Sequence, residues 1–179
     1  MVMMHHAKVS RWSIIFIASL LVSTRITAQQ SATLKISGLG NQTAEFSAKD
    51  LAQMARASVE VREPHRNEMQ HYEGVLLSDV LAKVGVPLGD KLRGNAMAMY
   101  VLARASDGYA VVYSLAELDP GMTDNHIIVA DRMNGQPLDA KEGPLKIVVP
   151  GDKRPARWIR MLTSLKVESA VNPSGSSLR

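Results

Sequence analysis

The stretch GPLKIVVPGDKRPARW, residues 143–158, decides how this chain folds. Its aliphatic run ends at Pro150 and Gly151, a pair that typically stops a strand in a turn. We therefore expect a buried strand whose exit presents charged groups on a rigid base, which is where many folds place a binding site. Beyond this turn, four cationic side chains surround one tryptophan, Trp158. They are Lys153, Arg154, Arg157 and Arg160.

The first 28 residues predict a secretory signal peptide. Lys8 and Arg11 precede an apolar run at residues 13–22, and a small residue, Ala28, follows it. A run of this length is too short to span a bilayer as a stable helix. We expect export with cleavage after Ala28; a short membrane anchor or a buried N-terminal helix is the alternative.

The rest of the chain predicts one domain over residues 29–170 and a disordered tail over 171–179, which is rich in proline, glycine and serine. Loss of Lys8, Arg11 and Arg25 with the signal peptide lowers the formal net charge from +4 to +1. This balance argues against a broad nucleic-acid-binding surface. The chain contains no cysteine, which excludes a disulfide, a thiolate metal ligand and a thiol nucleophile.

Alternating apolar residues, capping signals and turn formers predict an α+β domain. We expect a mixed sheet of about seven or eight strands with two or three short helices. Residues 63–70 are polar and contain a proline, so they predict a loop. The expected strands are 33–38, 43–46, 57–62, 97–105, 109–113, 127–131, the aliphatic part of 143–158, and 159–167, and residues 71–74 are a short strand or a turn. The expected helices are 48–56, 76–84 and 114–118, with a further helical turn at 154–158.

Five segments between residues 72 and 167 resemble, in the same order, the molybdopterin-binding domain of the sulfite oxidase family. Together they cover a large part of the domain, and their order makes the match specific. The resemblance implies a sulfite-oxidase-like fold with a cleft for a pterin. The segments are YEGVLL with DVL and GV at 72–86, SDGY at 106–109, IVA with NGQPL at 128–138, GPLKIVVPG at 143–151, and RWI at 157–159.

Two departures from the family pattern change what the resemblance implies. In the family, a cysteine in the loop before the first segment binds molybdenum, whereas residues 63–71 here contain none. Lys146 stands where the family has an arginine, and the region of Glu142 where it has a histidine. Lysine keeps a cation but lacks the planar fork that binds phosphate in a bidentate manner. The pterin cleft is thus expected to remain, without the molybdenum ligand and part of the pyrophosphate contacts.

The chain is more similar to small periplasmic pterin-binding proteins of this fold that lack the cysteine. As a group these resemble sensors that bind a free reduced pterin and signal to the periplasmic domain of an inner-membrane protein that makes and degrades cyclic di-GMP. The resemblance implies a periplasmic sensor that is not an enzyme and does not span the membrane after cleavage. The alternatives are a sulfite oxidase-like molybdopterin-dependent oxidoreductase without the cysteine ligand, and a scaffold that binds only a protein.

A pterin is flat and aromatic, and it is edged with donors and acceptors, so its site needs a stacking face and a few polar groups. Trp158 can supply the face, and Arg154 or Arg157 can stack or donate. Asp107 or Asp152 can accept from the 2-amino and N3 positions of the ring. The expected ligand-binding residues are Trp158, Arg157, Arg154, Lys153, Asp152, Lys146, Asp107, Ser106, Tyr109 and His65.

Each candidate also has a plainer interpretation. Trp158 can pack in the core, Asp107 can form the turn, and Tyr109 can be a core strand residue. Arg154 and Arg157 can be solvated surface charges. The sequence alone does not choose between these interpretations and ligand binding.

The histidines and serines do not favour catalysis. His65, His71 and His126 are scattered, and no carboxylate lies at a typical metal-ligand spacing from them. The sequence also lacks the motif that surrounds a nucleophilic serine in hydrolases. We therefore expect neither a metal site nor a catalytic residue.

Overall fold

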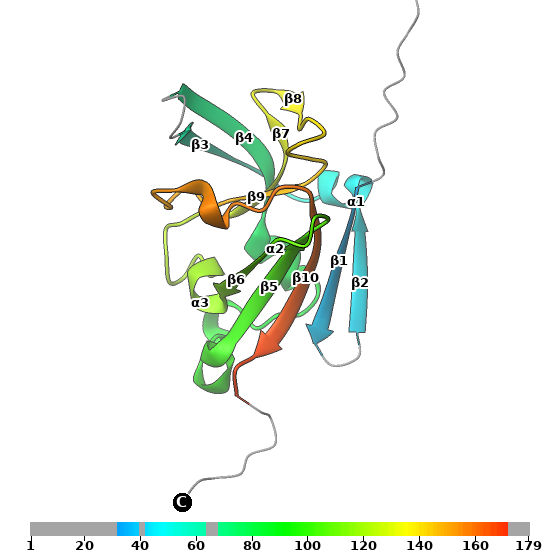
Figure 1. Ribbon diagram of the computed structural model, residues 1–179. Coiled ribbons are helices and arrows are strands. Elements are labelled where there is room, and N and C mark those ends of the chain that lie inside the picture. Colours follow the sequence, from blue (N-terminus) through cyan, green and yellow to red (C-terminus); the bar gives the residue numbers. More distant parts are fainter. Residues whose placement is uncertain (1–31, 40–41, 64–67, 172–179) are drawn as a thin grey trace, which may run out of the picture.

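The computed structural model describes residues 32–39, 42–63 and 68–171. The predicted signal peptide, His65 and residues 172–179 of the predicted tail lie outside this part of the chain. The described residues form ten strands in two five-stranded sheets (Figure 1). The α+β class is thus confirmed, but the strands are divided between two sheets, whereas a single sheet of seven or eight strands was expected.

The first sheet has the order β2-β1-β10-β5-β6. Its neighbours are antiparallel except for β1 and β10, which run parallel with Ile36 opposite Leu165. This pairing joins the first and last described strands of the domain. The bounds are β1 Thr33–Leu39, β2 Gln42–Ser47, β5 Met99–Ala105, β6 Ala110–Ser114 and β10 Leu162–Ser169.

The second sheet has the order β3-β4-β7-β8, and β9 pairs with β7. All of these pairs are antiparallel. The residues of β9 are buried, as the aliphatic run around it predicts. The bounds are β3 Arg56–Glu63, β4 Glu68–Leu76, β7 Ile128–Met133, β8 Gln136–Pro137 and β9 Lys146–Val148.

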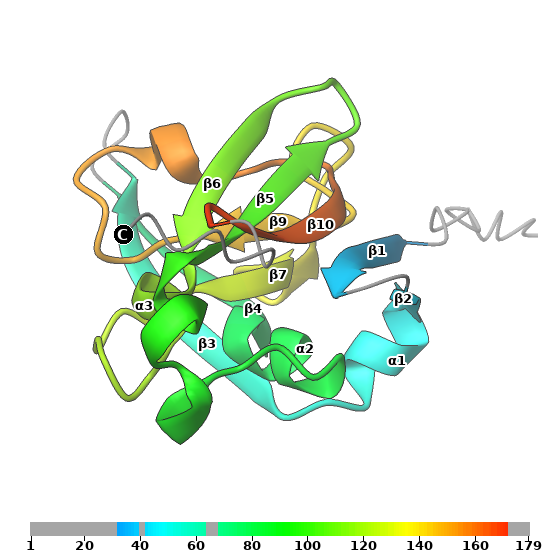
Figure 2. The same ribbon diagram turned by 90° about the horizontal axis from the view of Figure 1, so that it is seen from below.

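The helices are short, and two of them begin at the predicted caps. Ser47 and Ser114 each form a capping box, with Asp50 and Glu117 as the respective partners. In Figure 2, α1 and α2 lie on the same side of the molecule, opposite the hairpin of β5 and β6. The α-helices are α1 Ala48–Ala52, α2 Leu77–Lys83 and α3 Leu115–Leu118, and the 3-10 helices are η1 Gly89–Lys91, η2 Gly94–Ala98 and η3 Pro155–Arg157.

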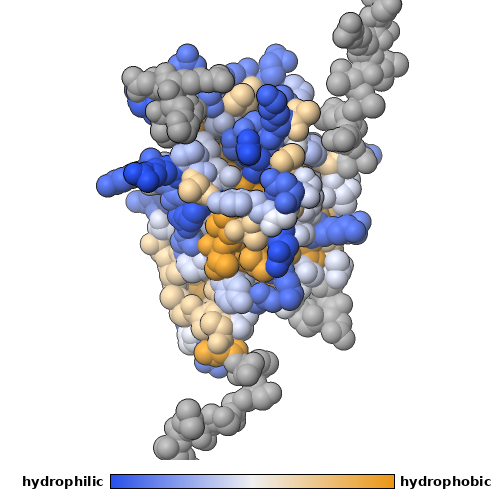
Figure 3. Space-filling model, viewed as in Figure 1, coloured by the Kyte–Doolittle hydropathy of each residue, from blue (hydrophilic) through white to orange (hydrophobic). Residues whose placement is uncertain are grey.

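One hydrophobic cluster connects the two sheets. Leu34 and Leu165 of the first sheet and Val75 and Ile147 of the second are all enclosed in it. Each such side chain stabilises the fold by about 1.5–3 kcal/mol relative to an exposed position. On the face seen in Figure 3, apolar residues lie near the centre and hydrophilic residues surround them.

Several expected boundaries were wrong, among them the end of the helix expected over 48–56, which the structure places at Ala52. Residues 68–70 belong to β4 although the sequence predicted a loop, because Arg62 pairs with Met69 and Glu63 with Glu68 across the β3–β4 ladder. Backbone pairing outweighs the polar composition there. The closing strand β10 begins at Leu162, since residues 159–161 follow the irregular turn that leaves η3. No helix of the described residues is long and apolar enough to cross a membrane.

Candidate functional site

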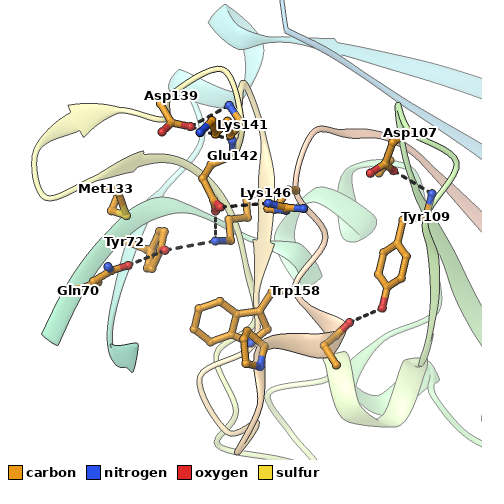
Figure 4. A pocket seen from close by; sticks show the side chains of 14 residues that line it. Gln70, Tyr72, Asp107, Tyr109, Met133, Asp139, Lys141, Glu142, Lys146 and Trp158 are labelled. Atoms are coloured by element: carbon orange, nitrogen blue, oxygen red, sulfur yellow. Dashed lines mark hydrogen bonds and ion pairs between the residues drawn. The ribbon is translucent and has the colours of Figure 1, made fainter. Parts of the chain in front are cut away.

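A pocket of about 730 Å³ is lined by residues from both sheets and by the loops around β9 (Figure 4). A volume of this size suits a small organic ligand. The lining combines aromatic rings with charged and amide side chains. Its members are Gln70, Tyr72, Ala105, Asp107, Tyr109, Met133, Asp139, Lys141, Glu142, Lys146, Pro155, Ala156, Trp158 and Arg160.

Tyr72 and Trp158 form the aromatic part of the pocket. Their ring centroids are 6.0 Å apart and their planes meet at 86°, which is the favoured edge-to-face arrangement. The Trp158 indole N–H donates to the carbonyl of Val149 at 3.0 Å, and the residue is only 8% exposed. Trp158 is thus held by its polar edge, and what it offers a ligand is apolar ring surface.

A chain of polar contacts crosses the pocket above these rings. Lys146 Nζ is ion-paired with Glu142 and donates to the Tyr72 hydroxyl at 3.3 Å. The Tyr72 hydroxyl in turn donates to Gln70 Oε1 at 2.9 Å. The Lys146 ammonium also lies 5.0 Å from the Tyr72 ring centroid and 5.4 Å from that of Trp158. These contacts offset the cost of burying the Lys146 charge.

Local structure explains how these side chains converge. Gln70 and Tyr72 are two residues apart on β4, so they project from the same face of the strand. The turn before β9 is organised by Asp139, whose carboxylate accepts from the backbone N–H groups of Lys141 at 2.8 Å and Glu142 at 2.9 Å. This turn directs Glu142 toward Lys146 (Figure 4).

The opposite wall comes from the β5–β6 turn and from η3. Tyr109 donates through its hydroxyl to the carbonyl of Ala156 at 2.6 Å, and its backbone N–H donates to Asp107 at 2.9 Å. Tyr109 is 50% exposed. It therefore both lines the pocket and holds the loop that carries Pro155, Ala156 and Trp158.

A second ionic cluster holds the same loop from outside the pocket lining. Arg157 binds Asp152 and Glu117, and these hydrogen bonds raise the pKa of the guanidinium above its ordinary value. The hydroxyl of Tyr113 donates to the backbone carbonyl of Arg157. Burial raises the pKa of that hydroxyl well above its ordinary value.

The structure brings some of the predicted site residues together and separates others. Trp158, Lys146, Asp107 and Tyr109 line the pocket. Trp158 also packs in the core and Asp107 also forms the turn, as the plainer interpretation of each residue expects. Ser106, Asp152, Lys153, Arg154 and Arg157 are not among the lining residues, and His65 lies outside the described residues.

Several lining residues were not singled out from the sequence as ligand-binding. Gln70 falls within residues 63–70, which predict a loop, and Tyr72 lies in a family-like segment that assigns it no ligand role. Their shared place on β4 is what brings both side chains into the pocket. Glu142 was noted only as a departure from the family pattern, and Arg160 only as one of the cations. Met133, Asp139 and Lys141 carried no local signal that points to a site.

Together, the two-sheet fold and its aromatic, charged pocket define an α+β domain whose pocket suits a small molecule. Residues 22–175 match the model of the oxidoreductase molybdopterin-binding domain, and the chain therefore belongs to that family. This result confirms the predicted sulfite oxidase-type domain.

Among solved structures, the chain is similar to the sulfane dehydrogenase SoxCD from Paracoccus pantotrophus. The match has a TM-score of 0.61 and 19% sequence identity, and it covers 79% of this chain and 39% of that chain. At this identity the likeness shows a shared fold, and the chain spans about two fifths of the SoxCD chain. No curated protein matches the sequence.

The family implies a molybdopterin cofactor, which consists of a pterin and a molybdenum ion. The residues of the pocket fit the pterin but not the metal. The aromatic and polar lining suits a pterin ring system. Molybdenum is different, because the chain has no cysteine to supply a soft thiolate ligand. Within the described ranges, no group of three or more histidine, aspartate or glutamate side chains is placed to hold a metal ion. The donor set therefore does not fit the family's metal centre.

Proposed function

We propose that this chain is a periplasmic pterin-binding protein that senses a free reduced pterin and relays its binding to an inner-membrane partner in cyclic di-GMP signalling. The observation that carries the proposal is a pocket with an aromatic floor in a chain that has no cysteine. Pterin recognition needs the first feature, and molybdenum catalysis of the family type needs the residue that is absent.

The pocket chemistry supports a pterin as the ligand. The rings of Tyr72 and Trp158 supply an apolar surface against which a bicyclic ring can pack. Asp107 and Glu142 place carboxylates in the lining, and a carboxylate pairs well with the adjacent donors of the 2-amino and N3 positions. Asp152, which the sequence also suggested for this role, is already bound by Arg157.

The ligand can be tested with the intrinsic fluorescence of the pocket. Residues 29–179 contain a single tryptophan, Trp158, so the emission of that segment reports on the pocket alone. We expect a tetrahydropterin to quench this emission in a saturable manner. The Trp158→Phe variant, followed by calorimetry, should bind up to about tenfold more weakly because part of the ring contact is lost.

Two controls complete this experiment. Lys153→Gln changes an exposed residue outside the pocket lining and should bind as the unsubstituted protein does. Metal analysis of the purified protein should find no stoichiometric molybdenum. Molybdenum at near-unit occupancy together with oxidoreductase activity would instead support the alternative, a molybdopterin-dependent enzyme without the cysteine ligand. Absence of pterin binding would favour the protein-binding scaffold.

Export and signalling need separate tests. N-terminal sequencing of the exported protein should begin at Gln29 or within a few residues of it, and an intact Met1 would contradict export through a cleaved signal peptide. Deletion of the gene should change cellular cyclic di-GMP, and the gene should lie beside one for a membrane protein with a periplasmic domain and cyclic di-GMP domains. An unchanged cyclic di-GMP level would argue against the relay.

A further inference from the structure

The charges in the pocket lining are balanced. Three cations line the pocket, Lys141, Lys146 and Arg160, and three carboxylates line it, Asp107, Asp139 and Glu142. A site that binds phosphate strongly usually presents an excess of positive charge or a bidentate arginine. The formal charge of this lining is zero, so the identity of the ligand depends on how these groups are paired.

Glu142 lies between two of the cations. Its Oε2 is ion-paired with Lys146, and its Oε1 is 3.9 Å from an Arg160 Nη1. The Lys146 side chain is only 7% exposed, and its ammonium also contacts the Tyr72 hydroxyl and two aromatic rings. The Glu142 side chain is 23% exposed and is therefore more accessible from the pocket than Lys146.

This arrangement opposes a phosphate in the pocket. Glu142 neutralises Lys146, so an anion that loses its hydration in the pocket gains little from this cation. It also meets the Glu142 carboxylate, and like charges about 5 Å apart in a partly buried site weaken binding by about 100-fold. A neutral ring with a donor edge meets no such repulsion, because the Glu142 oxygens can accept its hydrogen bonds.

We propose that Glu142 determines ligand specificity in this pocket: it accepts from the donor edge of an uncharged pterin and excludes pterins that carry a phosphate. This inference rests on the proposed function and adds the class of pterin that the pocket admits. It also gives Lys146 a role that differs from phosphate binding, since this cation holds Glu142 in place.

The test compares 7,8-dihydroneopterin with its phosphate ester by calorimetry on residues 29–179. The unsubstituted protein should bind the ester about 100-fold or more weakly than the neutral pterin. Glu142→Gln keeps the shape of the side chain and removes its charge, so the ratio of the two affinities should fall to about tenfold or less, with a gain in affinity for the ester. An unsubstituted protein that binds the ester as tightly as the neutral pterin would overturn the proposal.

Asp107→Asn is the matched comparison, because it removes one negative charge from the same lining while an amide oxygen can still accept from the Tyr109 backbone. Whatever its effect on overall affinity, it should change the ratio between the two ligands by less than about threefold, since Asp107 is not the carboxylate between Lys146 and Arg160. A change as large as that of Glu142→Gln would overturn the proposal in favour of a general charge effect.

Binding of inorganic pyrophosphate provides a second test of Glu142, and this test needs no pterin. The unsubstituted protein should show no binding of pyrophosphate at millimolar concentration, and Glu142→Gln should bind it in a salt-dependent manner. If no pterin binds the unsubstituted protein, the proposed function fails, but the comparison of pyrophosphate binding still tests the role of Glu142. Equal pyrophosphate binding by the two proteins would overturn the specificity role.

Glu142→Gln leaves Lys146 buried without its anionic partner, which can be strongly destabilising. Its fold is therefore checked by circular dichroism and thermal denaturation. Arg160→Gln is the second variant, because Arg160 is half exposed and its loss leaves the Lys146–Glu142 pair intact. It should weaken binding of the ester about threefold or more and change binding of the neutral pterin little. Tighter binding of the ester by Arg160→Gln would overturn the proposal.

Discussion

The guanidinium of Arg157 binds both carboxylate oxygens of Asp152, at 3.0 Å from Nε to Oδ2 and at 2.7 Å from Nη2 to Oδ1. A third contact joins Arg157 Nη1 to Glu117 at 2.6 Å. Both Arg157 and Asp152 were expected to bind a ligand, and the structure pairs them with each other outside the pocket lining. Their role in this structure is to fasten the loop that carries Pro155 and Trp158 to helix α3.

Loss of the ion pairs of Arg157 should lower the stability of the protein modestly. We expect Arg157→Gln to reduce the free energy of unfolding by about 1 kcal/mol, a value kept small because the side chain is 37% exposed and its ion pairs are screened by solvent. Urea denaturation at low salt provides the measurement. Arg154→Gln, an exposed neighbour, is the control and should change stability by less than about 0.5 kcal/mol. Equal effects of the two substitutions would show that the ion pairs do not stabilise the loop.

Tyr113 should make stability fall at alkaline pH. Burial raises the pKa of its hydroxyl above the ordinary value near 10, so the folded protein keeps a proton that the unfolded chain releases. The contribution is complete below about pH 10 and is lost above it, with a limiting slope of about 1.4 kcal/mol per pH unit.

The measurement is denaturant unfolding between pH 8 and pH 11, roughly spanning the ordinary tyrosine pKa. Tyr113→Phe should flatten the alkaline decline, because it removes the titrating group. Tyr109→Phe removes another hydroxyl bond to the same loop, the one to Ala156, and should leave the alkaline decline in place. A decline of equal slope in Tyr113→Phe would exclude Tyr113 as its source.

Gly74 should tolerate no side chain. A Cβ at this position would lie 2.1 Å from the carbonyl oxygen of Val129 and 2.7 Å from the Cα of Ala130, both in the backbone of β7. The ladder between β4 and β7 shifts register between Glu73 and Gly74, and a glycine inside a strand often marks such a site or a close approach of another backbone. We expect Gly74→Ala to lower the free energy of unfolding by about 3 kcal/mol or more.

Gly121→Ala is the control for this prediction. The Cβ there would meet only a side-chain oxygen of Asp119, at 3.1 Å, in a loop. Its cost should be about 1 kcal/mol or less. Thermal denaturation of both variants checks the difference, and a Gly74→Ala protein as stable as Gly121→Ala would show that β4 and β7 can separate without loss.

The hydroxyl of Tyr72 should stabilise the folded protein, because it accepts a hydrogen bond from Lys146 and donates one to Gln70 inside the pocket. Tyr72→Phe keeps the ring contact with Trp158 but leaves two buried polar groups with one partner fewer. We expect a loss of about 1–3 kcal/mol in the free energy of unfolding. A double-mutant cycle with Gln70→Leu measures the coupling, and strictly additive losses would contradict the polar chain.

Local features of the fold were predictable from the sequence. Ser47 and Ser114 cap their helices with the acidic residues three positions later, as the sequence indicates. Asp107 lies in the turn between β5 and β6, and the run before Pro150 is buried. Backbone conformation and burial over a few residues depend on near neighbours, so composition and spacing carry this information.

The composition of the pocket was decided by the tertiary structure. Four cations cluster beyond Pro150 in the sequence, yet Arg160 lines the pocket while Arg157 turns away to Asp152 and Glu117. Glu142 meets Lys146 only because the turn at Asp139 directs it there. Which charged group faces a ligand depends on pairs formed between distant elements, and spacing along the chain does not encode them.

The sequence by itself determined the family-like segments, the strand before Pro150 and the absence of any thiolate for a metal, since these are properties of residue identity and order. Only the tertiary structure decided that β1 and β10 pair in parallel within the first sheet, and that Glu142 lies between Arg160 and the Lys146 ammonium, which lies over the rings of Tyr72 and Trp158. The physical reason is that these contacts join residues far apart in the chain, whose energies exist only after the two sheets have packed.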